Sequence, residues 1–169
     1  MAELIHIVDY DPAWPQRYVE EAALVQQVLG PCCLHIHHVG STSVPGLSAK
    51  PVIDMVVECT DYPPTPAMIE ALASEDYLHR GEFGVVGRHF FSKGEPRAFH
   101  LHLVPEQGEV ARRLLAFRDY LREHPAAAQE YLAIKLRAAP GQVLGSNEYV
   151  MAKSPFVEGV LSEVLGIKF

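Results

Sequence analysis

The stretch HVGSTSVPGLSAKPVIDMVVE, residues 38–58, decides the fold that the sequence predicts. It passes through a turn of small residues that begins at Gly40, and it ends in an apolar run that carries one aspartate, Asp54. Because hydrophobic residues fill both odd and even positions over 51–59, this run predicts a central β-strand that is covered on both faces. A charged carboxylate is costly to bury there unless it is paired or holds a cation. Asp54 is therefore the first candidate for a functional residue.

The composition of the 169-residue chain limits the classes of function. Its length predicts a single domain, residues 1–169, that is large enough to bury a hydrophobic core. A net charge of −7 argues against binding to long nucleic acid, which depends on a basic surface. The sequence shows no signal-peptide pattern, no apolar stretch long enough for a membrane span and no cysteine framework. These features predict a cytoplasmic protein with no membrane partner.

The remaining periodicities predict a helix, then a short mixed sheet, then a helical C-terminal region. Further strands are predicted at 34–39 and as a hairpin of 88–93 and 97–104. Helices are predicted at 14–29, 66–75, 107–123, 125–138 and 146–165. Pro155 is expected to kink or restart the last helix, because proline removes a backbone donor. This order is typical of an α+β fold.

A Gly-Ser turn before an acidic strand is the core of the nucleotidyltransferase fold of the DNA polymerase β type. There, the turn holds a terminal phosphate, and strand carboxylates hold Mg²⁺. The usual pattern has carboxylates at positions i and i+2, but position 56 is Val56. Glu58 shares the face of Asp54 but lies about 13 Å further along the strand, which is too far to bracket one metal pair. The paired carboxylates are therefore absent from this strand.

A pair of histidines offers a substitute for the second carboxylate. His100 and His102 occupy alternate positions of the predicted strand 97–104, so they share one face. If this strand lies beside the strand of Asp54, the three side chains converge. Two histidines and a carboxylate form a common metal site, which favours Zn²⁺, Mn²⁺ or Fe²⁺ over Mg²⁺. The same spacing also fits two ordinary polar residues on a half-exposed sheet face.

The turn and nearby cations form a candidate phosphate site. The turn residues are Gly40, Ser41, Thr42 and Ser43. Their small side chains let backbone amides approach an anion, although the same turn could cap a short helix. Lys50 lies at the entrance of the Asp54 strand, and Arg118 lies at the edge of an apolar helical stripe, from which an arginine can bind phosphate.

Two lysines follow aromatic residues by one helical turn. Lys135 follows Tyr131, and Lys153 follows Tyr149, so each lysine lies beside a ring on one helical face. One interpretation places the ring against a base or sugar and the lysine on a phosphate. The alternative is a core aromatic residue with a long lysine side chain packed beside it.

Several motifs together resemble the GrpB family. They are HVGSTSVPGLSAKPVIDMVV at 38–57, FHLHLV at 99–104, LLAFRDYLREHP at 114–125 and EYVMAKSPFV at 148–157. The resemblance implies a nucleotidyltransferase-like fold with Asp54, His100 and His102 at the metal positions, where a divalent ion such as Mg²⁺, Mn²⁺ or Zn²⁺ would bind. It also implies that the family itself lacks the second carboxylate. A similar domain is fused to dephospho-CoA kinase in some bacteria.

These observations predict a nucleotidyltransferase-like enzyme that binds a nucleotide and acts on a small molecule. Asp54 is the expected catalytic carboxylate, with His100 and His102 as further metal ligands. The expected phosphate ligands are Gly40, Ser41, Thr42, Ser43, Lys50, Arg118, Lys135 and Lys153. Two alternatives remain open: a binding module for a nucleotide or coenzyme A without chemistry, and a metal-dependent phosphoester hydrolase.

Overall fold

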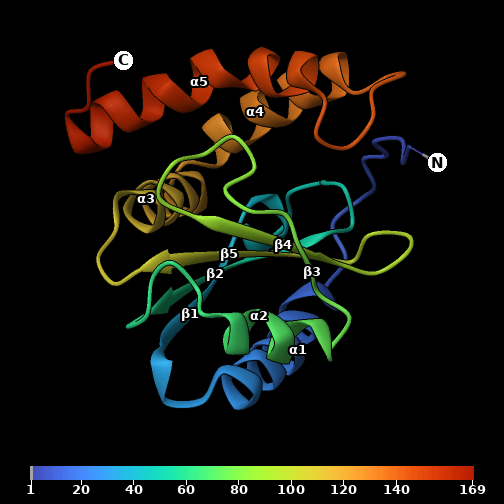
Figure 1. The fold of residues 1–169 in the computed structure, drawn as a ribbon. Coiled ribbons are helices and arrows are strands. Elements are labelled where there is room, and N and C mark those ends of the chain that lie inside the picture. Colours follow the sequence, from blue (N-terminus) through green and yellow to red (C-terminus); the bar gives the residue numbers. More distant parts are fainter. Residues whose placement is uncertain (1) are drawn as a thin grey trace.

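A five-stranded mixed sheet organises the computed structural model, which describes residues 2–169 (Figure 1). The strands are β1 (Cys33–Val39), β2 (Ile53–Cys59), β3 (Leu78–His79), β4 (His89–Lys93) and β5 (Phe99–Pro105), in the order β1-β2-β5-β4-β3. β2 pairs with β1 antiparallel and with β5 parallel, and β4 pairs antiparallel with both β5 and β3. The predicted α+β class is therefore confirmed.

Helices cover the two faces of this sheet unequally (Figure 1). The helices are α1 (Trp14–Leu29), α2 (Pro66–Ala73), α3 (Glu109–Glu123), α4 (Pro125–Ala138) and α5 (Asn147–Leu165). α1 and α2 pack on one face, whereas α3 lies against the other face and α4 and α5 lie beyond it. Within residues 2–169, no helix has the length and apolar character needed to cross a membrane.

The alternation of β2 explains how this central strand serves both faces. Met55 and its alternate neighbours join the main hydrophobic core under α1 and α2, which also contains Trp14 and Phe91. Val56 faces the other way and packs with Ala111 of α3. Burial on both faces confirms the prediction of a covered central strand.

The strand pairing fixes which side chains meet on the α3 face of the sheet. In the parallel pair of β2 and β5, Asp54 lies opposite His100, and Val56 lies opposite His102. In the antiparallel pair of β4 and β5, Phe90 lies opposite His102. Because side chains alternate along each strand, these residues share one face. We call this the site face.

An N-terminal strap, residues 3–8, joins two distant loops at the edge of the molecule. Val8 pairs with Ala49 through two backbone hydrogen bonds of 2.9 and 3.0 Å. Leu4 pairs with Val143 in the loop between α4 and α5. The strap therefore connects the segment before Lys50 with the entrance to the last helix.

The predicted elements differ from the structure in two respects. β3 is a two-residue edge strand that the sequence pattern does not indicate. α5 continues through Pro155, so the expected restart is wrong. Proline removes a hydrogen bond to the carbonyl four residues earlier, which belongs to Met151. Both residues are exposed, so water can satisfy that carbonyl and the helix is not broken.

Candidate functional site

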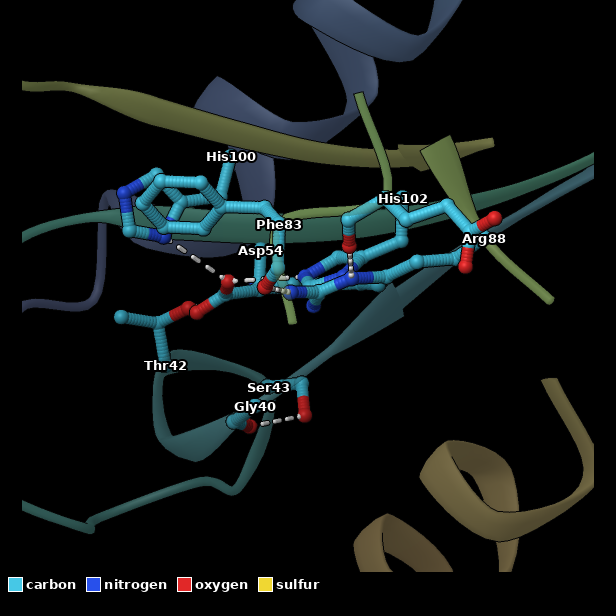
Figure 2. Close-up of polar contacts among 10 residues, drawn as sticks. Gly40, Thr42, Ser43, Asp54, Phe83, Arg88, His100 and His102 are labelled. Carbon is cyan, nitrogen blue, oxygen red and sulfur yellow. Dashed lines mark hydrogen bonds and ion pairs between the residues drawn. The ribbon is translucent and has the colours of Figure 1, made fainter. Parts of the chain in front are cut away.

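Three polar side chains converge on the site face between β2 and β5 (Figure 2). His100 Nδ1 lies 3.2 Å and His102 Nε2 lies 3.3 Å from the same carboxylate oxygen, Asp54 Oδ1. Both histidines are buried. The parallel pairing causes this meeting, because it sets Asp54 beside the strand that presents the two rings. The predicted convergence of the three residues is confirmed.

Arg88 determines which nitrogen of His102 carries the hydrogen. Its Nη1 lies 2.9 Å from His102 Nδ1 (Figure 2). A guanidinium group can only donate, so Nδ1 accepts and Nε2 carries the hydrogen that points to Asp54. Burial, together with the charges of Arg88 and His100, lowers the pKa of His102 against the opposing effect of Asp54. The ring is therefore neutral, with its hydrogen on Nε2.

Asp54 is an ionised carboxylate at the centre of this group. Burial alone would raise the pKa of Asp54, but the hydrogen bonds from His100 and His102 outweigh it and hold the pKa well below its ordinary value. An ionised carboxylate only accepts hydrogen bonds, so His100 Nδ1 donates. The other ring nitrogen, His100 Nε2, is buried and has no hydrogen-bond partner in the described part of the chain. The centre thus contains a polar atom that the protein itself does not satisfy.

The glycine of the turn allows the turn to approach Asp54. Gly40 has a φ of +74°, and a Cβ atom at this position would lie 2.8 Å from Asp54 Oδ2. Both the positive φ and the short distance require glycine. The chain then forms the short 3₁₀ turn η2 (Ser41–Ser43), in which the Thr42 hydroxyl lies 2.8 Å from His38 Nε2.

A cavity of about 520 Å³ opens beside Asp54. Its basic lining residues are Lys50, Arg88, Arg97, Lys135 and Lys153, and Asp54 is the acidic residue among the described residues that line it. Its aromatic lining residues are Phe83, Phe90, Phe117, Tyr131 and Tyr149. Gly40, Ser41 and Thr42 also belong to the wall. Basic and aromatic side chains thus surround one carboxylate at the predicted turn.

Lys135 connects α4 to the turn. Its side chain is 3% exposed, and its Nζ lies 2.9 Å from Ser41 Oγ and 3.2 Å from the carbonyl oxygen of Ser48. The same ammonium lies 5.1 Å from the centre of the Tyr131 ring. Burial, reinforced by two neighbouring lysines, lowers the pKa of Lys135 to about 7. Keeping the Lys135 ammonium charged in this buried position therefore costs free energy.

Lys153 reaches the same cavity from α5. Its Nζ lies 4.3 Å from the centre of the ring of Tyr149, which precedes Lys153 by one helical turn. Burial and the charge of Lys50 lower the pKa of Lys153 to about 8, and Asp54 opposes this shift. The structure therefore brings Lys50, Lys135 and Lys153 to the wall of one cavity, as the sequence predicted.

Two predicted phosphate ligands do not line the cavity. Arg118 Nη1 donates to the carbonyl of His38 at 3.1 Å, and its guanidinium also contacts Asp119. The expectation that Arg118 points into the cavity is wrong, because α3 packs against β1 and turns this side chain to the strand end. The Ser43 hydroxyl donates to the carbonyl of Gly40 at 2.5 Å, and the side chain is buried. Arg118 therefore binds the backbone at the end of β1, and Ser43 closes the turn by binding the carbonyl of Gly40.

Arg88 is the principal residue of the site that the sequence analysis missed. It precedes β4, where it shares the alternation of Phe90, the residue opposite His102. The signal is therefore the register of the predicted hairpin, which would place an arginine two positions before Phe90 on the histidine face. That register depends on the loop between the two strands, and the spacing of the motifs alone does not give it.

Comparison with protein families and relatives supports the motifs found in the sequence. The family model described as "GrpB protein" matches residues 4–163. The UPF0157 protein YqkA of Bacillus subtilis (strain 168) is 35% identical over 155 residues, which cover 91% of this chain and 45% of that protein. The chain thus spans less than half the length of this relative.

Two solved structures resemble the fold. The crystal structure of the conserved protein GrpB from Enterococcus faecalis has a TM-score of 0.85 and 35% identity, and the match covers 95% of this chain and 98% of that one. The structure of the GLD-2/RNP-8 complex matches with a TM-score of 0.57 and 12% identity, over 86% of this chain and 58% of that one. Both matches show a shared fold, and the mixed α+β fold class is confirmed.

Proposed function

This chain belongs to the GrpB family, and we propose that it is a nucleotidyltransferase-like enzyme that binds a nucleotide and modifies a small molecule. The observation that carries the proposal is the charge of the cavity. Five basic side chains and one acidic side chain line it, although the whole chain has a net charge of −7. Concentrated positive charge in an acidic protein favours a small polyanion over a long nucleic acid.

The lack of salt bridges to the basic residues of the cavity supports the proposal that an anion binds there. Across residues 2–169, the salt bridges include none made by the five basic cavity residues, which are Lys50, Arg88, Arg97, Lys135 and Lys153. Charges are rarely buried in proteins without a partner. The phosphates of a bound nucleotide would supply the missing negative charge. They would also raise the lowered pKa values of Lys135 and Lys153, so that both side chains would be protonated.

Each part of the cavity has a task in this proposal. Gly40 lets the turn approach Asp54. The Ser41 hydroxyl and the Lys135 ammonium bind a phosphate together, because they already lie 2.9 Å apart. The aromatic rings of Tyr131 and Tyr149 provide flat surfaces for a base or sugar. Helices α3 to α5 shield the reacting groups from water.

In this proposal, Asp54, His100 and His102 would hold a divalent ion. Two donor atoms bound to one ion at about 2.1 Å lie about 3.0–3.4 Å apart for tetrahedral or octahedral angles. The two distances between ring nitrogens and Asp54 Oδ1, 3.2 and 3.3 Å, fall in this range. His100 and His102 would complete the site, and two imidazoles favour Mn²⁺ or Zn²⁺ over Mg²⁺. When bound, the ion would neutralise phosphate charge and activate a nucleophile.

One observation favours a second candidate, a module that binds a nucleotide or coenzyme A without chemistry. The second carboxylate of a two-metal site would stand at Val56, which is fully buried against Val39, Val104 and Ala111. This packing leaves no room for a charged side chain at that position. The protein therefore depends on the two histidines for any metal chemistry.

The decisive experiment combines calorimetry with a turnover assay. Purified protein is titrated with each nucleoside triphosphate and with coenzyme A, then incubated with labelled nucleotide, Mn²⁺, Mg²⁺ or Zn²⁺ and a metabolite extract. We expect binding and consumption of one nucleotide. Asp54→Asn should abolish consumption but keep binding, because the five basic residues of the cavity remain. The exposed control Asp119→Asn should behave like the wild type. Binding without turnover would support the module instead. Release of phosphate without an acceptor would identify a hydrolase, and absence of binding would reject all three.

A further inference from the structure

Arg88 lies between the carboxylate centre and a loop that forms part of the cavity wall. Beyond its bond to His102, its Nε lies 3.3 Å from the carbonyl oxygen of Glu82, and its Nη2 lies 3.1 Å from that of Phe83. Its guanidinium also lies 4.9 Å from the centre of the Phe90 ring. Each of the three guanidinium nitrogens therefore makes one of these hydrogen bonds. Arg88 makes no salt bridge among the described residues.

The loop at residues 81–87 depends on these contacts. Figure 1 shows it rising from the sheet toward α4 and α5. Phe83 lines the cavity and adopts a φ of +49°, a conformation that costs a residue with a side chain about 1–2 kcal/mol. Its ring stacks on Phe90 at 5.2 Å, yet it remains 51% exposed, and Val86 is 86% exposed. The loop has few buried contacts, so the bonds from Arg88 have a large share in its position.

We propose that Arg88 is a positioning residue that closes the Asp54 centre to metal ions until an anion in the cavity draws its guanidinium away. This inference rests on the proposed metal and phosphate sites. It adds an order of events, since the anion and the metal ion then bind with positive coupling. It also adds a consequence for residues 81–87, which lose their anchor when the anion binds.

The hydrogen-bond chemistry of His102 gives the reason. While Nδ1 accepts from Arg88, Nε2 carries a hydrogen and has no lone pair to offer to an ion. If Arg88 leaves, the hydrogen can move to Nδ1, and the Nε2 lone pair then faces Asp54 Oδ1 across 3.3 Å. No proton is gained or lost in this exchange. A phosphate or sulfate binds the planar guanidinium more strongly than a neutral ring nitrogen does, because it offers charge and two acceptor oxygens.

Mn²⁺ titrations of the intact protein test this inference, with free Mn²⁺ measured by electron paramagnetic resonance. The variants are Arg88→Ala and the control Arg137→Ala, which removes an exposed arginine that does not line the cavity. We expect Arg88→Ala to bind Mn²⁺ at least tenfold more tightly than the wild type, and Arg137→Ala to stay within threefold. Sulfate, a weak ligand of Mn²⁺, should strengthen binding at least fivefold in the wild type and less than twofold in Arg88→Ala.

Hydrogen exchange at residues 81–87 supplies an independent measurement. Sulfate without metal should accelerate exchange there in the wild type, and Arg88→Ala should show the faster exchange without sulfate. If Arg88→Ala fails to fold, Arg88→Lys replaces it, since a lysine offers a point charge but not the fork that spans the ring and two carbonyls. Equal Mn²⁺ affinity in all variants overturns the Arg88 inference and leaves the metal site intact. No Mn²⁺ binding by any variant, Arg88→Ala included, overturns the metal site and the inference together.

Discussion

Two lysines on opposite faces of the sheet illustrate two uses of a buried charge. Lys93, on the face of α1 and α2, lies 2.7 Å from Glu21 Oε1, and the Tyr77 hydroxyl donates to the same oxygen at 2.8 Å. Lys135, on the site face, contacts a hydroxyl and a carbonyl but no carboxylate. The first charge is neutralised within the chain and helps to define the fold. In our proposal, the second charge is neutralised by a bound ligand.

The difference also has an energetic side. A buried ion pair is tolerated because each charge compensates the other, whereas an unpaired buried ammonium loses its hydration without replacement. The lowered pKa values of Lys135 and Lys153 express this loss. We therefore expect substitutions on the α1 face to change stability, and substitutions on the site face to change binding.

The largest expected effect follows from removing the partner of Lys93. Glu21→Ala leaves the half-buried Lys93 ammonium and the buried Tyr77 hydroxyl without an acceptor, so the free energy of unfolding should fall by about 3 kcal/mol. Urea denaturation at pH 7 measures this, and nucleotide affinity should stay within twofold. Glu20→Ala is the control, because Glu20 is exposed and its side chain accepts a hydrogen bond from Gln16 at the surface. A loss below 1 kcal/mol in Glu21→Ala would contradict the assignment of this pair to folding.

Lys135→Met should produce the opposite result. Methionine has nearly the same length without the charge, so nucleotide affinity should fall ten- to a hundredfold, equivalent to about 1.4–2.8 kcal/mol. The free energy of unfolding should stay equal or rise, because an unpaired buried cation is removed. Calorimetry and urea denaturation on the same samples test both statements. The exposed Lys168→Met should change neither quantity, and a large loss of stability in Lys135→Met would remove the contrast between the faces.

Gly40→Ala separates backbone strain from interference with Asp54. Gly40 and Gly141 share a φ of +74°, but only at Gly40 would a Cβ meet Asp54 Oδ2, whereas at Gly141 nothing lies within 4 Å. Both alanine variants should lose about 1–2 kcal/mol of unfolding free energy. Only Gly40→Ala should also lose Mn²⁺ and nucleotide binding in titrations. If Gly141→Ala lost binding equally, the effect would belong to strain alone.

The smallest expected effect is a dependence on pH. Polyanion binding favours charged lysines, and burial lowers the pKa of Lys135 to about 7 and that of Lys153 to about 8. Below these values both are already charged, so affinity should fall only as the pH rises through them. Deprotonation of Lys135 should cost no more affinity than its replacement by methionine. ATP affinity measured between about pH 7.5 and 9.5 avoids titration of the phosphate itself. Lys135→Met should halve the slope, and a flat profile would contradict proton uptake on binding.

The convergence of Asp54 with His100 and His102 could be predicted because it depends on a single assumption. Alternation along a strand places the histidines on one face, and only the adjacency of two strands had to be assumed. Lys135 and Lys153 were predicted from their position one helical turn after an aromatic residue. Here, local pattern and global fold agree.

Arg118 and Arg88 could not be placed in this way, because their contacts depend on tertiary packing. Helical periodicity correctly set Arg118 at the edge of a stripe, but the carbonyl of His38 that it meets belongs to the end of β1. Arg88 depends on the hairpin register and on the path of a loop with little secondary structure. Long arginine side chains can reach several partners from one backbone position, so sequence spacing does not choose among them.

The N-terminal strap has a consequence for the order in which the protein is made. Ile5 donates to the carbonyl of Gln142 at 2.9 Å, and Val8 pairs with Ala49 on the cavity wall. A ribosome needs on the order of ten seconds to translate the residues between the strap and Gln142. Until then, one edge of the cavity has no fixed position. The proposed ligand can therefore meet the complete cavity only after Gln142 has been translated.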